Sequence, residues 1–503
     1  MYKTGNVMNY RSTRSQNGEA VSAAVAIKNG LAPDGGLYMP ESIPTLSAED
    51  LVALAGMTYP ERAARILSLY LTDYTEEELL EDCREAYAES RFPGGAAPLR
   101  PVDGDVYSLE LWHGPTSAFK DMALQIMPRL LSRALKKTGE DRTALILVAT
   151  SGDTGKAALE GYRDVDGIKI LVFYPTDGVS RIQKLQMTTQ EGNNVGVRGI
   201  YGNFDDAQSG VKRIFSDSAI AERLNGAGVF LSSANSINWG RLAPQIAYYV
   251  SAYCDMLTAG YIEAGAPIDI AVPTGNFGNI FAAYLARLMG VPIGRLICAS
   301  NSNNVLTEFL ETGTYDRNRD FHMTVSPSMD ILISSNLERL LYLVVGPEKT
   351  AEYMKKLLNN GAYSLAEEEI AAIKKIFTGY CCSEAETAKN IRTAFTRYGY
   401  LIDTHTAVGY GAARKHLAAV GKKTPIVLAS TASPYKFAPA VYSAVKGENA
   451  PEGTEALLAL EKVSSTKIPA PLTGLDEKPI LHAETIRHED MAEAVMRFAG
   501  INA

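Results

Sequence analysis

A glycine-rich turn follows an apolar run and is typical of an anion site. The run is IDIAV (268–272), and an apolar helix is expected from residue 280. Backbone N–H groups at the start of a helix bind anions, and glycine lets a ligand approach closely. The turn lacks the features of a nucleotide P-loop and of a dinucleotide site. It predicts a site for a monophosphate, and the alternative is a tight turn that needs glycine for geometry alone. The turn reads Pro273, Thr274, Gly275, Asn276, Phe277, Gly278 and Asn279.

Lys120 lies between turn residues and an apolar helix. Gly114 and Pro115 favour a turn, and Ser117 is a candidate N-cap. Lys120 is therefore expected in the first helical turn, where the positive end of the helix dipole disfavours an ammonium group. A lowered pKa would make its amine a usable nucleophile. The alternative is an ordinary surface lysine.

Two further polar loops follow apolar runs. The run ending at Ala149 leads into Thr150, Ser151, Gly152, Asp153 and Thr154, and the run at 424–430 leads into Thr431. Hydroxyls and free amides at a helix start hold carboxylates, and sites form where parallel strands end. The alternative at the first loop is simple N-capping. Four such features at strand ends favour a single site.

Alternating apolar runs and helical segments position these loops. Buried strands are expected at 144–150, 168–174, 195–201, 229–232, 268–272, 295–300 and 424–430. Helical segments are expected between them, including 154–163, 180–190, 205–224 and 240–259. This succession predicts an α/β fold with two lobes whose strand ends face a shared cleft. A Pro/Gly/Ala-rich stretch at 91–101 marks a boundary after an N-terminal part.

Composition and residue spacing argue against several classes of protein. The 503 residues carry a net charge of −8, which does not favour a nucleic-acid binder. Five scattered cysteines and six histidines match no disulfide framework or metal spacing, so no metal is expected. No apolar stretch suits a membrane span, and the first ten residues lack the apolar part of a secretory signal. We therefore expect a cytoplasmic enzyme with a small-molecule substrate, no nucleic acid and no membrane.

The motifs together resemble a known family. HGPTSAFKD (113–121), ATSGDTGKAA (149–158), PTGNFGNIFAAY (273–284) and STASPYKF (430–437) look like threonine synthase, a fold-type-II pyridoxal-phosphate enzyme. Further similar blocks are NYRSTR (9–14), GLAPDGGLYMPE (30–41), SANSINWGRLAPQ (233–245), SPSMDI (326–331) and DTHTAVGYGAA (403–413). They cover nearly the whole chain in family order.

The resemblance implies an architecture of two doubly wound lobes, like the tryptophan synthase β chain, with a helical or mixed N-terminal domain. The implied domains are an N-terminal domain (1–98), a large cofactor-binding domain (99–140 and 230–503) and a small α/β domain (141–229).

The resemblance also implies roles for residues. Lys120 would form the Schiff base with pyridoxal 5′-phosphate, Gly275 to Asn279 would hold the cofactor phosphate, and Thr431 would hydrogen-bond the ring nitrogen. The loop from Thr150 to Thr154 would receive the substrate carboxylate. Relatives with Asn at the position of Asp153 use it at the cofactor's 3′-oxygen, whereas a carboxylate there repels a phenolate unless one is protonated. The partner of the 3′-oxygen therefore stays open.

The implied reaction converts O-phospho-L-homoserine and water to L-threonine and phosphate, with Lys120 as the base. Arg241, Lys184 and Arg181 are candidates for the substrate phosphate, and the alternative for each is a solvated charge. A rival hypothesis is a dehydratase acting on serine or threonine. A second is a non-catalytic binder of a phosphorylated metabolite, which the retained Lys120 disfavours.

Overall fold

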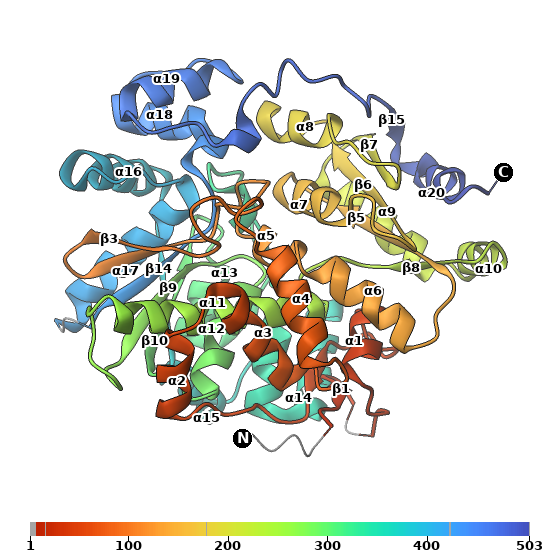
Figure 1. Ribbon diagram of the computed structural model, residues 1–503, viewed down its shortest axis with the longest axis horizontal. Coiled ribbons are helices and arrows are strands. Elements are labelled where there is room, and N and C mark those ends of the chain that lie inside the picture. The colour runs from red at the N-terminus through yellow and green to blue at the C-terminus, as the bar shows by residue number, and fades with distance from the viewer. Residues whose placement is uncertain (1–6, 16, 178, 422–423, 502–503) are drawn as a thin grey trace.

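Two β-sheets with helices packed on them form the framework of the computed structural model (Figure 1). The structure describes residues 7–15, 17–177, 179–421 and 424–501. The larger sheet has six strands in the order β13-β10-β9-β14-β4-β3. Its strands are β3 (Leu99–Asp103), β4 (Val106–Glu110), β9 (Ile268–Pro273), β10 (Ile293–Ser300), β13 (Phe377–Cys381) and β14 (Ile426–Ser430).

The larger sheet is parallel except at one edge, where β3 runs antiparallel to β4. Every residue of β9 and β14 is buried, because helices cover both faces of these central strands. Strands buried on both faces have continuous apolar sequences, which explains IDIAV and IVLAS. The carboxyl ends of β9 and β14 therefore lie at one edge of the sheet, where sites form.

The smaller sheet has five parallel strands in the order β15-β7-β6-β5-β8. Its strands are β5 (Thr143–Ala149), β6 (Ile168–Pro175), β7 (Val195–Tyr201), β8 (Val229–Ser232) and β15 (Thr485–Arg487). The edge strand β15 comes from the C-terminal part of the chain, and α20 (Met491–Ala499) packs on the same lobe. Strand β15 and residues 230–232 of β8 thus lie in the smaller sheet, although the predicted division assigns 230–503 to the large domain. The domain division stays a prediction.

Helices account for most of the remaining chain. Those before the second sheet are α1 (Ala23–Asn29), α2 (Ala48–Ala55), α3 (Tyr59–Tyr70), α4 (Glu76–Ala86), α5 (Asp121–Leu124) and α6 (Met127–Lys137). Those up to the glycine-rich turn are α7 (Asp153–Tyr162), α8 (Arg181–Thr188), α9 (Phe204–Ser216), α10 (Ser218–Gly226) and α11 (Trp239–Thr258). Those after it are α12 (Gly278–Leu288), α13 (Val305–Thr312), α14 (Leu337–Asn360), α15 (Glu367–Lys374), α16 (Glu384–Tyr398), α17 (Thr404–Val420), α18 (Ala438–Lys446) and α19 (Glu455–Ser464).

Short elements complete the fold. Two antiparallel pairs lie outside the large sheets, and single 3₁₀ turns connect longer elements. The pairs are β1 (Tyr10–Ser12) with β2 (Tyr38–Pro40) and β11 (Thr314–Asp316) with β12 (Ala362–Ser364); the 3₁₀ turns are η1 (Pro327–Met329), η2 (Pro434–Phe437), η3 (Ala470–Leu472) and η4 (His488–Asp490).

One predicted helix is two helices in the structure. The segment 205–224 is divided at Asp217, whose carboxylate accepts hydrogen bonds from the N–H groups of Ala219 and Ile220 and so caps α10. An Asp in this position competes with a continuous helix by bonding the local backbone. Within the described residues, no helix is long and apolar enough to cross a bilayer.

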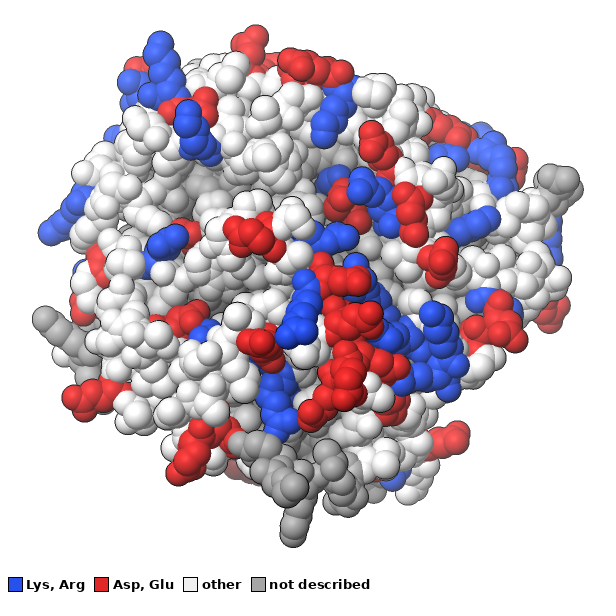
Figure 2. Space-filling model, in the orientation of Figure 1, with Lys and Arg blue, Asp and Glu red and all other residues white. Residues whose placement is uncertain are grey.

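Charges of both signs are mixed on one face of the molecule. Figure 2 shows acidic and basic side chains side by side over α4 and α6. Arg133 of α6 pairs there with Glu81 and Asp82 of α4, and Lys137 pairs with Glu78. The Arg133–Glu81 pair has an exposed carboxylate, whereas Asp82 is buried beneath Arg133. On this face the charges therefore balance locally and form no single-signed patch.

Candidate active site

The loop before Lys120 is fixed by a buried carboxylate. Asp121 accepts hydrogen bonds from the N–H of Thr116 (2.8 Å) and from its hydroxyl (2.8 Å). A Cβ at Gly114 would lie 2.5 Å from the Asp121 carboxylate, so only glycine fits there. Burial raises the pKa of Asp121 to about 7. The turn that leads into Lys120 is thus closed by local contacts that the sequence Gly-Pro-Thr specifies.

Lys120 directly precedes α5 and does not lie in its first turn. The predicted cap, Ser117, has a left-handed backbone (φ 59°) and a buried hydroxyl that has no hydrogen-bond partner among the described residues. The loop instead pairs with the segment after β14, where the N–H of Phe119 donates to the carbonyl of Thr431 (2.8 Å). The loop that carries Lys120 is therefore held against the segment after β14, at the carboxyl edge of the larger sheet.

The amine of Lys120 lies in a nearly closed site, with its side chain 11% exposed. It donates to the hydroxyl of Ser328 (3.2 Å) and lies 3.9 Å from the carboxylate of Asp153. Burial, opposed by Asp153 and assisted by the cations Lys436 and Arg241, lowers the pKa of Lys120 to about 8. The predicted lowering of the pKa thus has burial as its main cause, where the sequence suggested the helix dipole.

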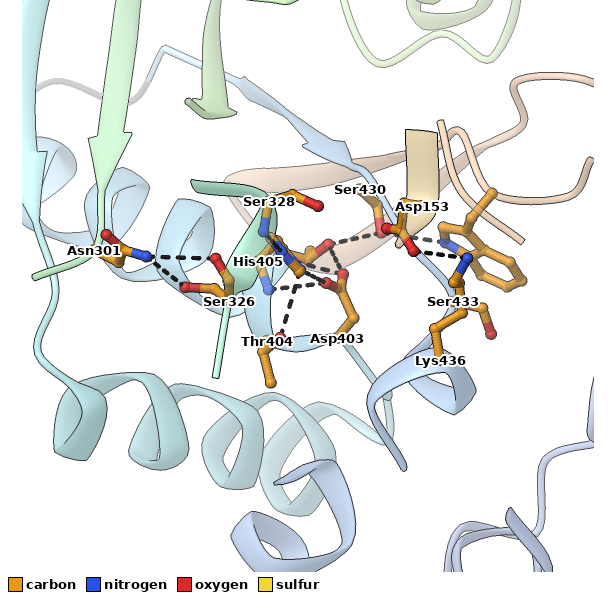
Figure 3. Close-up of polar contacts among 12 residues, drawn as sticks. Asp153, Asn301, Ser326, Ser328, Asp403, Thr404, His405, Ser430, Ser433 and Lys436 are labelled. Atoms are coloured by element: carbon orange, nitrogen blue, oxygen red, sulfur yellow. Dashed lines mark hydrogen bonds and ion pairs between the residues drawn. The ribbon is translucent and has the colours of Figure 1, made fainter. Parts of the chain in front are cut away.

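Lys436 is a second buried lysine at this site, and sequence reasoning missed it. Its side chain is fully buried, and its ammonium lies 2.8 Å from the Asp153 carboxylate and donates to the carbonyl of Thr116 (3.0 Å). Gln183 also donates to Asp153 (2.9 Å). Burial alone would raise the pKa of Asp153, but Lys436, Lys120 and the hydrogen bonds outweigh it and hold that pKa below its usual range. Asp153 is therefore ionised and paired (Figure 3).

The glycine-rich turn forms a group of free amides at the start of α12. Phe277 adopts a left-handed backbone (φ 63°) and caps the helix. In the described part of the chain, the N–H groups of residues 275–279 have no hydrogen-bond acceptor. The amide nitrogen of the Asn279 side chain is also buried and unpartnered, while its oxygen accepts from Tyr248 (2.8 Å) and Tyr249. An anion at this point would satisfy these donors.

A chain of contacts connects this turn to the N-terminal motif. The carbonyl of Asn276 accepts from the backbone N–H of Asn336 (3.0 Å) just before α14. Two residues later, Glu338 accepts two hydrogen bonds from the Arg14 guanidinium (2.7 and 2.8 Å) and one from Thr13 (2.5 Å). The NYRSTR segment therefore anchors the helix whose start supports the anion-binding turn.

Thr431 lies where β14 ends and is 6% exposed. Its hydroxyl has no hydrogen-bond partner in the part of the chain that the structure describes. A free hydroxyl at a strand end is available to a ligand.

In the loop from Thr150 to Thr154, some groups bond within the loop and others are free to contact a ligand. The Thr150 hydroxyl accepts from the N–H groups of Gly152 (3.0 Å) and Gly155 (2.9 Å) and so closes the loop. Gly152 has a φ of 141°, and a Cβ there would lie 2.5 Å from Gln183. Ser151 and Thr154 remain partly exposed, so their hydroxyls are the groups of this loop that a carboxylate can reach.

The three predicted phosphate candidates differ in their surroundings. Arg241 of α11 is 4% exposed and donates to the carbonyl of Ala234 (2.5 Å), and its buried Nε has no partner within the residues that the structure describes. Burial lowers its pKa to about 10. Arg181 and Lys184 are exposed. Arg181 lines a cavity of about 1010 Å³ between α16, α18 and residues 449–453, which Lys120 does not reach.

Comparison with known proteins covers nearly the whole chain. Residues 9–87 match the family model described as threonine synthase N terminus, residues 91–432 match pyridoxal-phosphate dependent enzyme, and residues 406–491 match threonine synthase, C-terminal. A threonine synthase from Pseudomonas aeruginosa is 39% identical over 450 residues, which is 88% of this chain and 91% of that protein. The chain belongs to the threonine synthase family.

Two further relatives are similar to this chain over most of its length. The crystal structure of a pyridoxal-phosphate-bound threonine synthase from Brucella melitensis superposes with a TM-score of 0.86 at 36% identity, covering 98% of this chain and 99% of that one. Human threonine synthase-like 1 is 41% identical over 433 residues, or 84% of this chain. The match spans only 58% of that longer protein.

Family membership confirms the fold-type-II α/β architecture, the N-terminal region and pyridoxal phosphate as the cofactor. The residues of this chain fit that cofactor, because a buried amine, a set of unpartnered amides and a free hydroxyl lie at one sheet edge. Among the described residues, no group of His, Cys, Asp and Glu suits a metal ion. Sequence reasoning missed Lys436 and Ser328 as site residues; the available signals were a lysine within the apolar segment SPYKF and the SPSMDI block.

Proposed function

We propose that this chain converts O-phospho-L-homoserine and water to L-threonine and phosphate, the last step of threonine biosynthesis. Its main support is the match to threonine synthases along residues 9–491, with a buried, deprotonable Lys120 at the site. The reaction class is that of a carbon-oxygen lyase acting on a phosphate ester. A cytoplasmic location belongs to the same proposal.

Lys120 is the residue we assign to cofactor attachment and proton transfer. With a pKa of about 8, roughly a quarter of the free amine is neutral at pH 7.5. A neutral amine takes the proton from the substrate Cα and returns it there at the end of the reaction. Its neighbours hold it within the site for both transfers. No other base in this proposal touches Cα.

The amides of Gly275, Asn276, Phe277, Gly278 and Asn279 are assigned to the cofactor phosphate. Thr431 is assigned to the ring nitrogen. When bound, pyridoxal phosphate draws electron density away from the substrate carbons next to its amine. A hydroxyl is a weak acid, so Thr431 holds the ring without protonating it fully.

Substrate contacts are assigned from exposure and charge. The substrate carboxylate meets Ser151 and Thr154, while Thr150 and Asp153 shape the loop from behind. Arg241 is assigned to the substrate phosphate, because it is a buried cation with an unpartnered Nε. A proton leaves Cβ and phosphate leaves Cγ; a proton then adds at Cγ, and the hydroxyl of water adds at Cβ. Binding of the substrate phosphate favours closure of the two lobes, which excludes water from the site until the addition at Cβ.

A coupled assay tests this proposal. Purified protein with O-phospho-L-homoserine should release threonine and phosphate in equal amounts, whereas homoserine should give neither, because a free hydroxyl is a poor leaving group. Serine and threonine serve as controls for the dehydratase hypothesis. Formation of a 2-oxo acid and ammonia from them, without threonine synthesis from the phosphate ester, would overturn the proposal.

A further inference from the structure

A line of hydrogen bonds connects Lys120 through Ser328 to the buried pair of His405 and Asp403. The hydroxyl of Ser328, in η1, accepts from the Lys120 amine (3.2 Å). The N–H of Ser328 donates to Nε2 of His405 (3.1 Å), and Nδ1 of His405 lies 2.9 Å from Asp403 (Figure 3). His405 and Asp403 are buried at the start of α17.

The donors in this line fix the protonation state of His405. An N–H group such as that of Ser328 only donates, so Nε2 of His405 is the acceptor. The ring proton is therefore on Nδ1 and is donated to Asp403. The second oxygen of Asp403 accepts from the hydroxyl and the N–H of Thr406. His405 is thus a neutral ring with one tautomer.

The turn that carries Ser328 is also fixed from its other side. Asp330 accepts hydrogen bonds from Asn301 (2.7 Å), Asn303 (3.0 Å) and Thr324 (2.7 Å). The carbonyl of Ser328 lies so close to Gly275 that a Cβ there would come within 2.6 Å of it. Ser328 therefore has little freedom to move away from the amine.

Ser328 is the hydrogen-bond partner of the Lys120 amine within the described residues, because Asp153, at 3.9 Å, is beyond hydrogen-bond distance. We propose that Ser328 holds the Lys120 amine whenever it is not bonded to the cofactor, with His405 and Asp403 as positioning residues for Ser328. This inference rests on the proposed role of Lys120 as the lysine that carries the cofactor. In this proposal the SPSMDI and DTHTA segments together position the amine of Lys120.

The test measures the amine directly in the full-length chain stripped of cofactor. The rate at which acetic anhydride labels Lys120 is followed from pH 6 to 11 by mass spectrometry. A hydroxyl that accepts from an ammonium favours its charged form. Ser328→Ala should therefore lower the pKa of Lys120 by about 1. Ser328→Thr keeps the hydroxyl and should leave the pH dependence of labelling unchanged.

His405 offers a matched pair of variants. His405→Gln retains an acceptor for the Ser328 N–H and should label like the normal protein. His405→Leu removes it and should follow Ser328→Ala. Circular dichroism checks the fold, and if His405→Leu does not fold, the Ser328 pair carries the test.

Unchanged labelling of Lys120 in Ser328→Ala would overturn the inference, and so would equal effects of Gln and Leu at folded His405. Because labelling needs no substrate, this outcome is independent of whether the protein makes threonine. In the holoenzyme, Ser328→Ala should move the rising limb of kcat to lower pH by about 1 and leave KM nearly unchanged, since Ser328 contacts the amine and is not assigned to the substrate.

Discussion

Replacing Lys436 by methionine should make Lys120 a weaker base catalyst at neutral pH. Both ammonium groups face the Asp153 carboxylate, at 2.8 Å for Lys436 and 3.9 Å for Lys120. They therefore repel each other, and this repulsion is one cause of the lowered pKa of Lys120. In Lys436→Met the repulsion is lost and Asp153 keeps Lys120 as its one ammonium partner. The pKa of Lys120 should rise.

The size of this rise follows from the separation of the two charges. Because they share one carboxylate, the ammonium groups lie within roughly 9 Å of each other, where repulsion at an effective dielectric of about 20 is about 2 kcal/mol. Such an energy raises a pKa by about 1.5. From a starting pKa of about 8, the neutral fraction of Lys120 at pH 7.5 would fall from roughly a quarter to about 1%.

Two measurements follow this change. Labelling of Lys120 in cofactor-free protein should show the higher pKa, and the rising limb of kcat/KM should move to higher pH by the same amount. The sign is fixed, since activity that needs a neutral amine appears only as pH rises through its pKa. Lys436→Met should also destabilise the fold by about 3–5 kcal/mol, because Asp153 loses its closest buried partner.

The matched control is the double variant Asp153→Asn with Lys436→Met. Removing both charges leaves a neutral pair, so the pKa of Lys120 and much of the stability should return towards normal. A Lys120 pKa that is unchanged or lower in Lys436→Met, in a folded protein, would refute the electrostatic coupling of these three residues.

Variants at four other residues test the assigned roles. Lys120→Ala should abolish turnover in a folded protein, and borohydride reduction of the normal protein followed by peptide mapping should find the cofactor on Lys120; attachment to another lysine would contradict this. Thr431→Asp should change the absorption spectrum of the bound cofactor, and if neither it nor Thr431→Ala changes spectrum or rate, Thr431 does not contact the ring nitrogen. Gly275→Ala should weaken cofactor binding at least tenfold, measured by equilibrium dialysis, because its Cβ would lie 2.6 Å from the Ser328 carbonyl; normal affinity would refute that. Arg241→Ala should lower kcat/KM for the phosphate ester roughly 10- to 100-fold with normal cofactor content, whereas lost cofactor would place Arg241 at the cofactor.

The fold and the glycine-rich turn were predictable because their signals are local. The run IDIAV, two glycines and an apolar helix specify a strand, a turn and a helix start within about 20 residues. Lys120 was singled out for a similar reason. The motif resemblance implied a role for Thr431 that its own segment does not specify.

Contacts between distant segments were not predictable. Lys436 pairs with Asp153 across two lobes, and Ser328 meets His405 although 77 residues separate them. Packing in three dimensions brings these groups together, and one sequence carries no record of it. The same holds for β15, whose short strand TIR joins the smaller sheet although α18 and α19, which precede it, pack in a different core. The cause of the lowered Lys120 pKa was misjudged because burial depends on such contacts.

Turnover in water enriched with ¹⁸O tests the central claim most directly. Elimination at Cγ followed by addition of water at Cβ breaks the carbon-oxygen bond of the ester, so it places one labelled oxygen in threonine and none in the released phosphate. Mass spectrometry of both products from O-phospho-L-homoserine should show this pattern, at a ratio of one threonine to one phosphate. Label in the phosphate, with homoserine as the second product, would mean cleavage at phosphorus and would contradict the account.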